Sequence, residues 1–233
     1  MASVIQIQAV HYPESDGKPM GETDVHRDAM IRHIELLQYL FRGQRVYVSG
    51  DLLVYYVQGN PKKFIVPDAF VAKGVKPGKR RIYKIWIEGK APDAVIETTS
   101  RKTQRKDTLE KPTLYAELGV KEYFLFDPEQ EYLEPPLQGH RLSGDGYQRI
   151  VPDETGALVS KELGLRLRLE VEVVQFYRLD TGERLLTAEE RAALEAEARQ
   201  REAEARQREA EARRAAEAEL ARLRKELSRR PPE

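Results

Sequence analysis

Residues 123–126 read Tyr-Phe-Leu-Phe, four large apolar side chains in succession. A strand with one face in water alternates apolar and polar residues, whereas an unbroken apolar run is typical of a strand buried on both faces. We therefore predict that this run is a central strand of a sheet that has helices on both sides. The preceding residues 107–118 are predicted to form a helix that ends at Gly119.

Further apolar segments of the first 187 residues supply the other predicted elements. Residues 24–41 are predicted to form an amphipathic helix, because Met30, Ile34 and Leu37 recur at spacings of three and four. Strands are predicted within residues 45–57, 93–98, 165–169 and 173–177 and in the apolar run 64–72, which Pro67-Asp68 interrupts; a hairpin is predicted over residues 140–151. This order of elements predicts an α/β fold with a mixed central sheet flanked by helices.

The C-terminal part of the chain has a different composition. From about Leu185 it consists mainly of Ala, Glu, Arg and Gln, and residues 195–208 repeat Glu-Ala-Glu-Ala-Arg-Gln-Arg twice. Glutamates four residues before arginines stabilise a helix without a partner. We predict an α/β domain over residues 1–187 and a long charged helical tail over residues 188–233. The tail offers one short coiled-coil patch with a three-four spacing, formed by Leu220, Leu223 and Leu227.

Composition limits the functions that the chain can have. There are 39 basic and 39 acidic side chains, so tight nucleic-acid binding would need a local basic patch. The absence of cysteine excludes disulfides and thiolate metal sites. We found neither a signal peptide nor an apolar run approaching the ~20 residues of a membrane span. We therefore expect a cytoplasmic protein, monomeric or self-associating through the core or the tail.

Two acids stand within apolar runs, Asp68 in residues 65–71 and Glu97 after Val95-Ile96. A buried carboxylate is costly unless something compensates it. Two such acids on neighbouring strands would repel each other, and a divalent cation would remove that penalty. Carboxylate oxygens, backbone carbonyls and water suit Mg²⁺, which can activate water for attack on a phosphate. Taken singly, Asp68 could instead accept hydrogen bonds in a turn and Glu97 could end a strand in solvent.

Basic residues follow each of the two acids. One group spans residues 73–84 and the other spans residues 101–106. Such side chains make most of the phosphate contacts in nucleic-acid complexes, although charge alone is equally consistent with solvated loops. The predicted nucleic-acid contacts are Lys79, Arg80, Arg81, Arg101, Lys102, Arg105 and Lys106.

These motifs, taken in order, resemble the Uma-two family of restriction-endonuclease-like proteins in the PD-(D/E)XK nuclease superfamily. The resemblance covers roughly residues 23–187. It depends on Val66-Pro67-Asp68, on Val95-Ile96-Glu97-Thr98-Thr99-Ser100, on residues 107–111 with Tyr115, on residues 119–123 and on Phe126-Asp127-Pro128.

The resemblance implies a restriction-endonuclease-like core in which Asp68, Glu97 and the backbone carbonyl of Thr98 hold Mg²⁺ or Mn²⁺. The superfamily places a lysine two residues after the second acid, but this chain has Thr99 there. Lys111 is the natural substitute, because it lies four residues after Asp107 on the same helix face. Lys102 and Lys106 are the next candidates, and a surface Lys111 paired only with Asp107 is an equal alternative.

The implied function is that of a metal-dependent endonuclease that hydrolyses phosphodiester bonds of nucleic acid, with DNA the expected polymer and Asp68, Glu97 and Lys111 as catalytic residues. Two alternatives remain open. The missing Glu-x-Lys lysine favours a catalytically inactive nucleic-acid-binding module, and the neutral net charge with the tail favours a protein-interaction adaptor. His26 and His33 share one face of the first predicted helix, where packing or surface positions are the expected roles.

Overall fold

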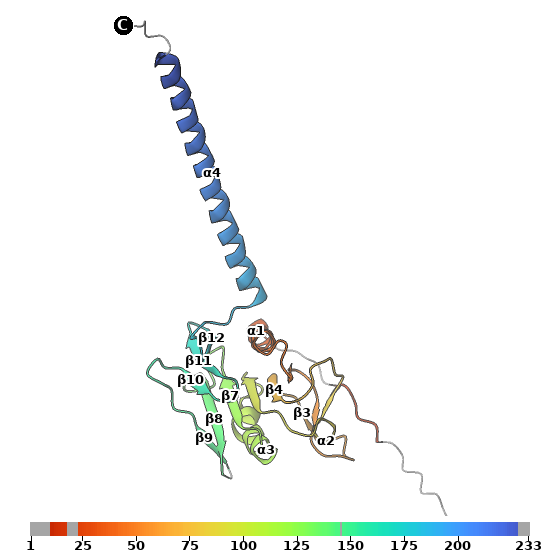
Figure 1. Cartoon of the computed structure of the whole chain (residues 1–233). Helices are drawn as coiled ribbons and strands as arrows, with labels where there is room; N and C mark the ends of the chain where they lie inside the picture. Colours follow the sequence, from red (N-terminus) through yellow and green to blue (C-terminus); the bar gives the residue numbers. More distant parts are fainter. Residues whose placement is uncertain (1–9, 18–22, 145, 228–233) are drawn as a thin grey trace, which may run out of the picture. The chain divides into compact units, whose positions relative to one another are not determined.

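The computed structural model describes residues 10–17, 23–144 and 146–227 (Figure 1). The N-terminal residues 1–9, which entered the signal-peptide prediction, lie outside this part. The chain divides into two compact units, Met1–Leu185 and Leu186–Glu233. No helix in the described part is long and apolar enough to cross a membrane.

A mixed sheet of six strands forms the centre of the first unit. Its order is β1 (Val46–Ser49), β4 (Ala69–Lys73), β6 (Ala94–Thr98), β7 (Glu122–Phe126), β8 (Leu137–Ser143) and β9 (Gly146–Arg149). Only the β6–β7 pair is parallel, and the other neighbours are antiparallel. Every residue of β6 and β7 is buried, which confirms the central strand predicted at residues 123–126.

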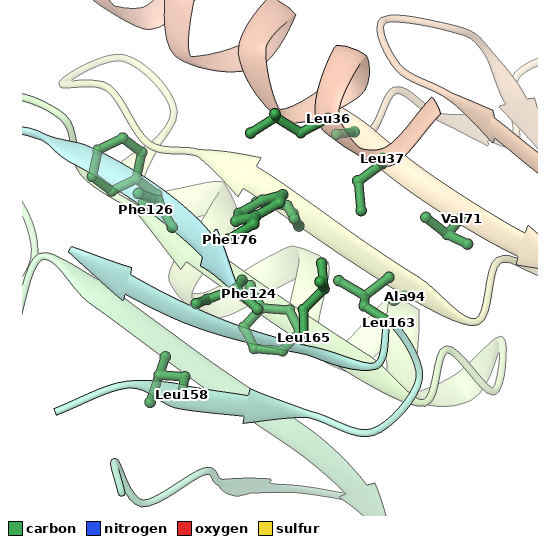
Figure 2. Close-up of a cluster of buried hydrophobic side chains, with 14 of the residues drawn as sticks. Leu36, Leu37, Val71, Ala94, Phe124, Phe126, Leu158, Leu163, Leu165 and Phe176 are labelled. Atoms are coloured by element: carbon green, nitrogen blue, oxygen red, sulfur yellow. The ribbon is translucent and has the colours of Figure 1, made fainter. Parts of the chain in front are cut away.

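One face of this sheet is covered by α1 (Asp24–Leu40) and by a small sheet of β10 (Leu158–Ser160), β11 (Leu165–Glu170) and β12 (Val173–Arg178). Thr23 caps α1, because its hydroxyl accepts a hydrogen bond from the backbone of His26. Figure 2 shows Leu36 and Leu37 of α1 above the sheet, together with Phe124 and Phe126 of β7. The two predicted strands near residues 165–177 exist, but they belong to this separate sheet.

The opposite face packs on a helical segment made of a wide π-helical turn, η1 (Lys106–Glu110), and α3 (Lys111–Glu117). Its core contains Tyr115, Tyr123 and Leu125. Side chains alternate along a strand, so Tyr123 and Leu125 point to α3 while Phe124 and Phe126 point to α1. A third sheet consists of β3 (Phe64–Ile65), β2 (Val54–Tyr55) and β5 (Tyr83–Lys84) in that order, and the short helix α2 (Ile85–Glu88) follows β5 in the sequence.

The apolar run over residues 64–72, which Pro67-Asp68 interrupts, forms two separate strands. Its two parts, β3 and β4, lie in different sheets. Proline has no N–H for a strand ladder, and the carbonyl of Pro67 accepts a hydrogen bond from the backbone of Asp51 at 2.9 Å. The chain therefore leaves one sheet before Pro67 and enters the other after Asp68.

The second unit contains α4 (Ala188–Leu227), the long charged helix that the repeat predicts. It begins with a capping box, because Thr187 and Glu190 exchange side-chain-to-backbone hydrogen bonds of 2.7 and 3.2 Å. Glutamate–arginine pairs follow at a spacing of four, such as Glu197–Arg201 at 3.2 Å. Leu220 and Leu223 are about half exposed, and the side chain of Leu227 lies outside the described part.

Candidate active site

The two predicted acids lie at neighbouring strands of the central sheet, Glu97 within β6 and Asp68 directly before β4. Ala69 of β4 pairs with Ile96 of β6, and continuing this register by one residue sets Asp68 opposite Glu97. The backbone N–H of Asp68 donates to Oε2 of Glu97 at 3.2 Å, and that of Thr98 donates to Oδ2 of Asp68 at 2.7 Å. The structure thus brings both carboxylates together on the face that α3 covers.

A glycine allows Asp68 to reach this position. Gly50 lies so close to the Asp68 backbone that an added Cβ would stand 1.9 Å from the Asp68 carbonyl oxygen and 2.6 Å from Ile34. No Cβ can occupy that space, so a side chain here would push the Pro67-Asp68 turn away. Gly50 therefore takes part in positioning the first acid.

Lys111 reaches the acids from the start of α3. Its Nζ lies 2.9 Å from Oε2 of Glu97 and 2.7 Å from Oδ1 of Asp107. The wide turn of η1 holds Asp107 in the interior, where its carbonyl accepts a hydrogen bond from Tyr123. Such π-helical turns are frequent at functional sites. We call Asp68, Glu97, Asp107 and Lys111 the Glu97 cluster.

Two further residues of the site were missed by sequence reasoning. Tyr115 donates its hydroxyl hydrogen to Oε1 of Glu97 at 2.6 Å, and Nε2 of His26 lies 2.6 Å from the carbonyl oxygen of Thr98. His26 is buried and also stands 3.7 Å from Oδ2 of Asp68. In the sequence, Tyr115 was noted only as one of the residues that resemble the family pattern. His26 was noted only for sharing a helix face with His33, and its contact with Thr98 was missed because 72 residues separate the two.

His33 has the packing role expected of it. It stacks on the ring of Phe176 with centroids 5.5 Å apart and meets Phe126 edge-on. Burial lowers the pKa of His33 to about 3, so this imidazole is neutral. The first helix thus carries one histidine in the core and one at the acids.

Burial dominates the electrostatics of the site. It raises the pKa of Glu97 to about 8 and that of Asp68 to about 6, against the opposing effect of Lys111. Burial alone would lower the pKa of Lys111, but Glu97 and Asp107 raise it well above its ordinary value. Lys111 therefore keeps its charge at neutral pH, while three acids share this one ammonium group.

The donor set of the cluster fits a hard divalent cation. Magnesium is usually held by one or two carboxylates and keeps several waters, which matches two carboxylates beside a backbone carbonyl. In the described residues no three His, Cys, Asp or Glu side chains form a ready-made cage. Because the cluster contains three carboxyl groups and one ammonium group, it still favours binding of a further cation. Asp68, Glu97 and the Thr98 carbonyl could bind that cation.

The two predicted groups of basic residues differ in whether their side chains form ion pairs within the protein. Arg80 pairs with Glu88 at 2.7 Å and lies 3.9 Å over the ring of Tyr47, and Arg81 pairs with Glu14. Lys79 is exposed. The second group lies between the end of β6 and the first residue of η1. Its members are exposed and form no ion pair with a described residue: Arg101, Lys102, Arg105 and Lys106. Lys102 and Lys106 therefore point to solvent, whereas Lys111 lies in the cluster.

Comparison with known proteins agrees with this description. The sequence model of the family Uma2, described as "Putative restriction endonuclease", matches residues 8–174. A crystal structure described as a "putative nuclease belonging to DUF820" from Anabaena variabilis ATCC 29413 is similar, with a TM-score of 0.45 and 17% identity over 63% of this chain and 76% of that chain. No curated protein matches. The match over most of the length shows that this chain belongs to the Uma2 family of restriction-endonuclease-like proteins.

Proposed function

We propose that this protein is a metal-dependent endonuclease that hydrolyses phosphodiester bonds of nucleic acid. One observation carries the proposal: the buried Glu97 of β6 and the partly buried Asp68 before β4 are joined by a backbone hydrogen bond, and the ammonium of Lys111 lies 2.9 Å from Glu97. A cluster in which three acids face one lysine is costly to bury unless it binds a cation. Membership of a restriction-endonuclease-like family supports the same conclusion.

Asp68, Glu97 and the Thr98 carbonyl would hold Mg²⁺ or Mn²⁺. When bound, the metal lowers the pKa of a water ligand and stabilises charge on the phosphate. In the reaction, a water oxygen bonds to phosphorus, one ester P–O bond breaks, and the departing oxygen ends with a proton. Lys111 stays charged, so it donates hydrogen bonds to a phosphate oxygen or to the attacking water instead of accepting a proton. Asp107 holds that ammonium in place at 2.7 Å.

The substrate backbone would meet the exposed basic residues that follow β6, up to the first residue of η1. Arg101, Lys102, Arg105 and Lys106 lie on the segment that joins Glu97 to Lys111. Arginine and lysine contacts to phosphate position a nucleic acid without reading its sequence. We expect DNA to be the polymer, with weaker binding at high salt because released counterions favour complex formation at low salt.

The test is cleavage of a labelled oligonucleotide and a supercoiled plasmid with Mg²⁺, with Mn²⁺ and with EDTA. Activity should require the metal and should fall about a hundredfold or more in Lys111→Met and in Glu97→Gln. Glu110→Gln, an exposed position in η1, is the matched control and should cleave normally. Metal-independent activity, or full activity in Glu97→Gln, would contradict the proposal.

A second candidate is a catalytically inactive nucleic-acid-binding module. It is favoured by the ion pair that Lys111 already makes with Glu97, which partly compensates the acids without a metal. This candidate predicts oligonucleotide binding that depends on Arg105 and Lys106, with no cleavage in any metal. It also predicts that Glu97→Gln leaves binding unchanged.

A further inference from the structure

A groove of about 690 Å³ lies on the same face of the sheet as the Glu97 cluster. Thr108, Pro112 and Thr113 of η1 and α3 line one side of it. Gln138, His140 and Tyr147 of β8 and β9 line the other side. The groove is within the size range of sites for small ligands.

The groove adjoins the acids through the sheet and through the helical segment. Glu97 of β6 pairs with Leu125 of β7, which pairs with Gln138 of β8, and the last two residues line the groove. Residues paired in this way point to the same face. In the helical segment, Thr108 follows Asp107 and Pro112 follows Lys111. A ligand in the groove would therefore lie next to the catalytic residues.

The chemistry of the groove suits a neutral planar group. Among the described residues that line it, Glu117 alone is charged at neutral pH, because burial lowers the pKa of His140. The remaining polar groups include the Gln138 amide and the Thr108 and Thr113 hydroxyls. Amides and hydroxyls recognise the edges of nucleobases, and aromatic side chains such as those of His140 and Tyr147 stack on them.

Two cationic side chains precede the groove residue Thr108 in the sequence and do not line the groove. Arg105 and Lys106 are exposed and lie three and two residues before Thr108. A nucleotide has its charge on the phosphate and none on the base at neutral pH. The separation of cations from a neutral groove therefore matches the two parts of one nucleotide.

We propose that this groove holds an unpaired base beside the phosphodiester that is cleaved, so that the substrate is single-stranded nucleic acid. This inference rests on the proposed endonuclease function. In a duplex the bases are stacked and paired, and placing one of them in the groove would require it to flip out at a cost in free energy. A single strand offers its bases without that cost.

The experiment measures binding by fluorescence anisotropy in EDTA, with labelled 12-mers as single-stranded DNA, single-stranded RNA and blunt duplex DNA. The protein should bind a single strand at least about tenfold more tightly than the duplex, which corresponds to the contact of one base. The DNA and RNA arms identify the polymer. Thr113→Trp fills the groove from an exposed position of α3 and should abolish the preference, as should Gln138→Leu.

Two control variants separate the groove from general effects. Leu109→Trp introduces the same indole at an exposed position of η1 outside the groove, and Gln148→Leu removes the same kind of amide from β9 outside it. Both should bind like the wild type. Equal binding of duplex and single strand, or groove variants that keep the preference, would overturn the inference.

Cleavage assays on the same variants distinguish this inference from the proposed function. If duplex and single strand are cleaved equally well and Thr113→Trp cleaves normally, the groove inference fails and the endonuclease stands. If no cleavage occurs in any metal but the single-strand preference depends on Thr113 and Gln138, the endonuclease fails and the groove remains a binding site.

Discussion

The two ends of β6 each hold a buried acid, and they differ in what surrounds it. Before the strand, Asp93 receives hydrogen bonds from Lys90 at 2.6 Å and from Lys121 at 2.9 Å. We call the group of Asp93, Glu162, Lys73, Lys90 and Lys121 the Asp93 cluster, in which three lysines pair with two acids. At the other end, the Glu97 cluster has three acids and one lysine.

The pKa values of the two acids reflect this difference. Burial raises the pKa of Asp93, but hydrogen bonds from Lys90, Lys121 and the Lys73 backbone leave it below its ordinary value. Burial raises the pKa of Glu97 to about 8, and one shared lysine does not offset it. A buried acid is therefore no sign of a functional site by itself. The sign is an excess of acid that the protein leaves uncompensated.

The largest effect should come from Gly50→Ala at the Glu97 end. The new Cβ would overlap the Asp68 carbonyl, so Asp68 must move, and a displacement of about 1 Å in a catalytic group costs about a hundredfold in rate. Gly139→Ala is the matched control, because its Cβ would press on Phe124 at 2.9 Å, away from the acids. Both variants should lose about 1–3 kcal/mol of stability through overpacking. Only Gly50→Ala should lose activity, and equal activity in the two variants would refute its positioning role.

Neutralising the acid should destabilise the protein at the Asp93 end but not at the Glu97 end. Asp93→Asn removes charged hydrogen bonds and should destabilise the protein by about 2 kcal/mol. Glu97→Gln removes one acid from an acid-rich cluster and should leave stability in EDTA unchanged or higher. Urea unfolding of the two variants beside the wild type measures both effects. A Glu97→Gln protein as unstable as Asp93→Asn would show that Glu97 is a structural acid.

The pH dependence of stability in EDTA should also differ between the acids at the two ends of β6. Glu97 and Asp68 have raised pKa values in the folded state, so the folded protein holds protons that the unfolded chain releases. The contribution of these two acids to the free energy of unfolding therefore falls as pH rises from about 4.5 to about 8. Asp93 has a lowered pKa, so its contribution is present at neutral pH and is lost in acid. Unfolding at a series of pH values should show a decline from pH 5 to 8 that Glu97→Gln flattens. A Glu97→Gln profile parallel to that of the wild type would contradict the raised pKa.

The smallest effect should come from removing the tail after Thr187. The two buried apolar clusters lie between Leu36 and Leu185, and the residues of the Glu97 cluster all precede Lys121. The ion pairs of α4 are exposed, and such pairs contribute only ~0.3–0.5 kcal/mol each to a helix. Truncation should change stability by less than about 0.5 kcal/mol and leave metal affinity intact. Light scattering of both lengths would show any loss of self-association. Unfolding or loss of metal binding would show that the tail supports the domain.

Local patterns predicted the elements that depend on few residues. The apolar run at residues 123–126 identified the central strand, the repeat identified α4, and Gly144 and Gly146 identified the turn between β8 and β9. The assignment of strands to sheets was not predictable in this way. Pro67 divides one apolar run between two sheets, and β10 to β12 form a sheet of their own, because pairing depends on partners far along the chain.

The residues of the site were predictable where a local sequence pattern marked them, and not where they depend on long-range contacts. Asp68 and Glu97 stood out as acids within apolar runs, and Lys111 was selected through the family resemblance and its spacing from Asp107. The structure brings these residues together, although their catalytic roles remain predictions. His26 reaches Thr98 only because α1 packs on the sheet, and Asp93 escaped notice although it is as buried as Asp107. Long-range contacts of this kind leave no local pattern in a sequence.

Calorimetric titration of the full-length protein with Mn²⁺ tests the central claim most directly. We predict one bound ion per chain, an affinity at least about tenfold lower in Glu97→Gln, and an unchanged affinity in Asp93→Asn under conditions where that variant is folded. The same titration with Mg²⁺ should give weaker binding with the same dependence on Glu97. Absence of binding to the wild type, or equal affinity in the wild type and Glu97→Gln, would show that the acid excess at this end of β6 is not a metal site.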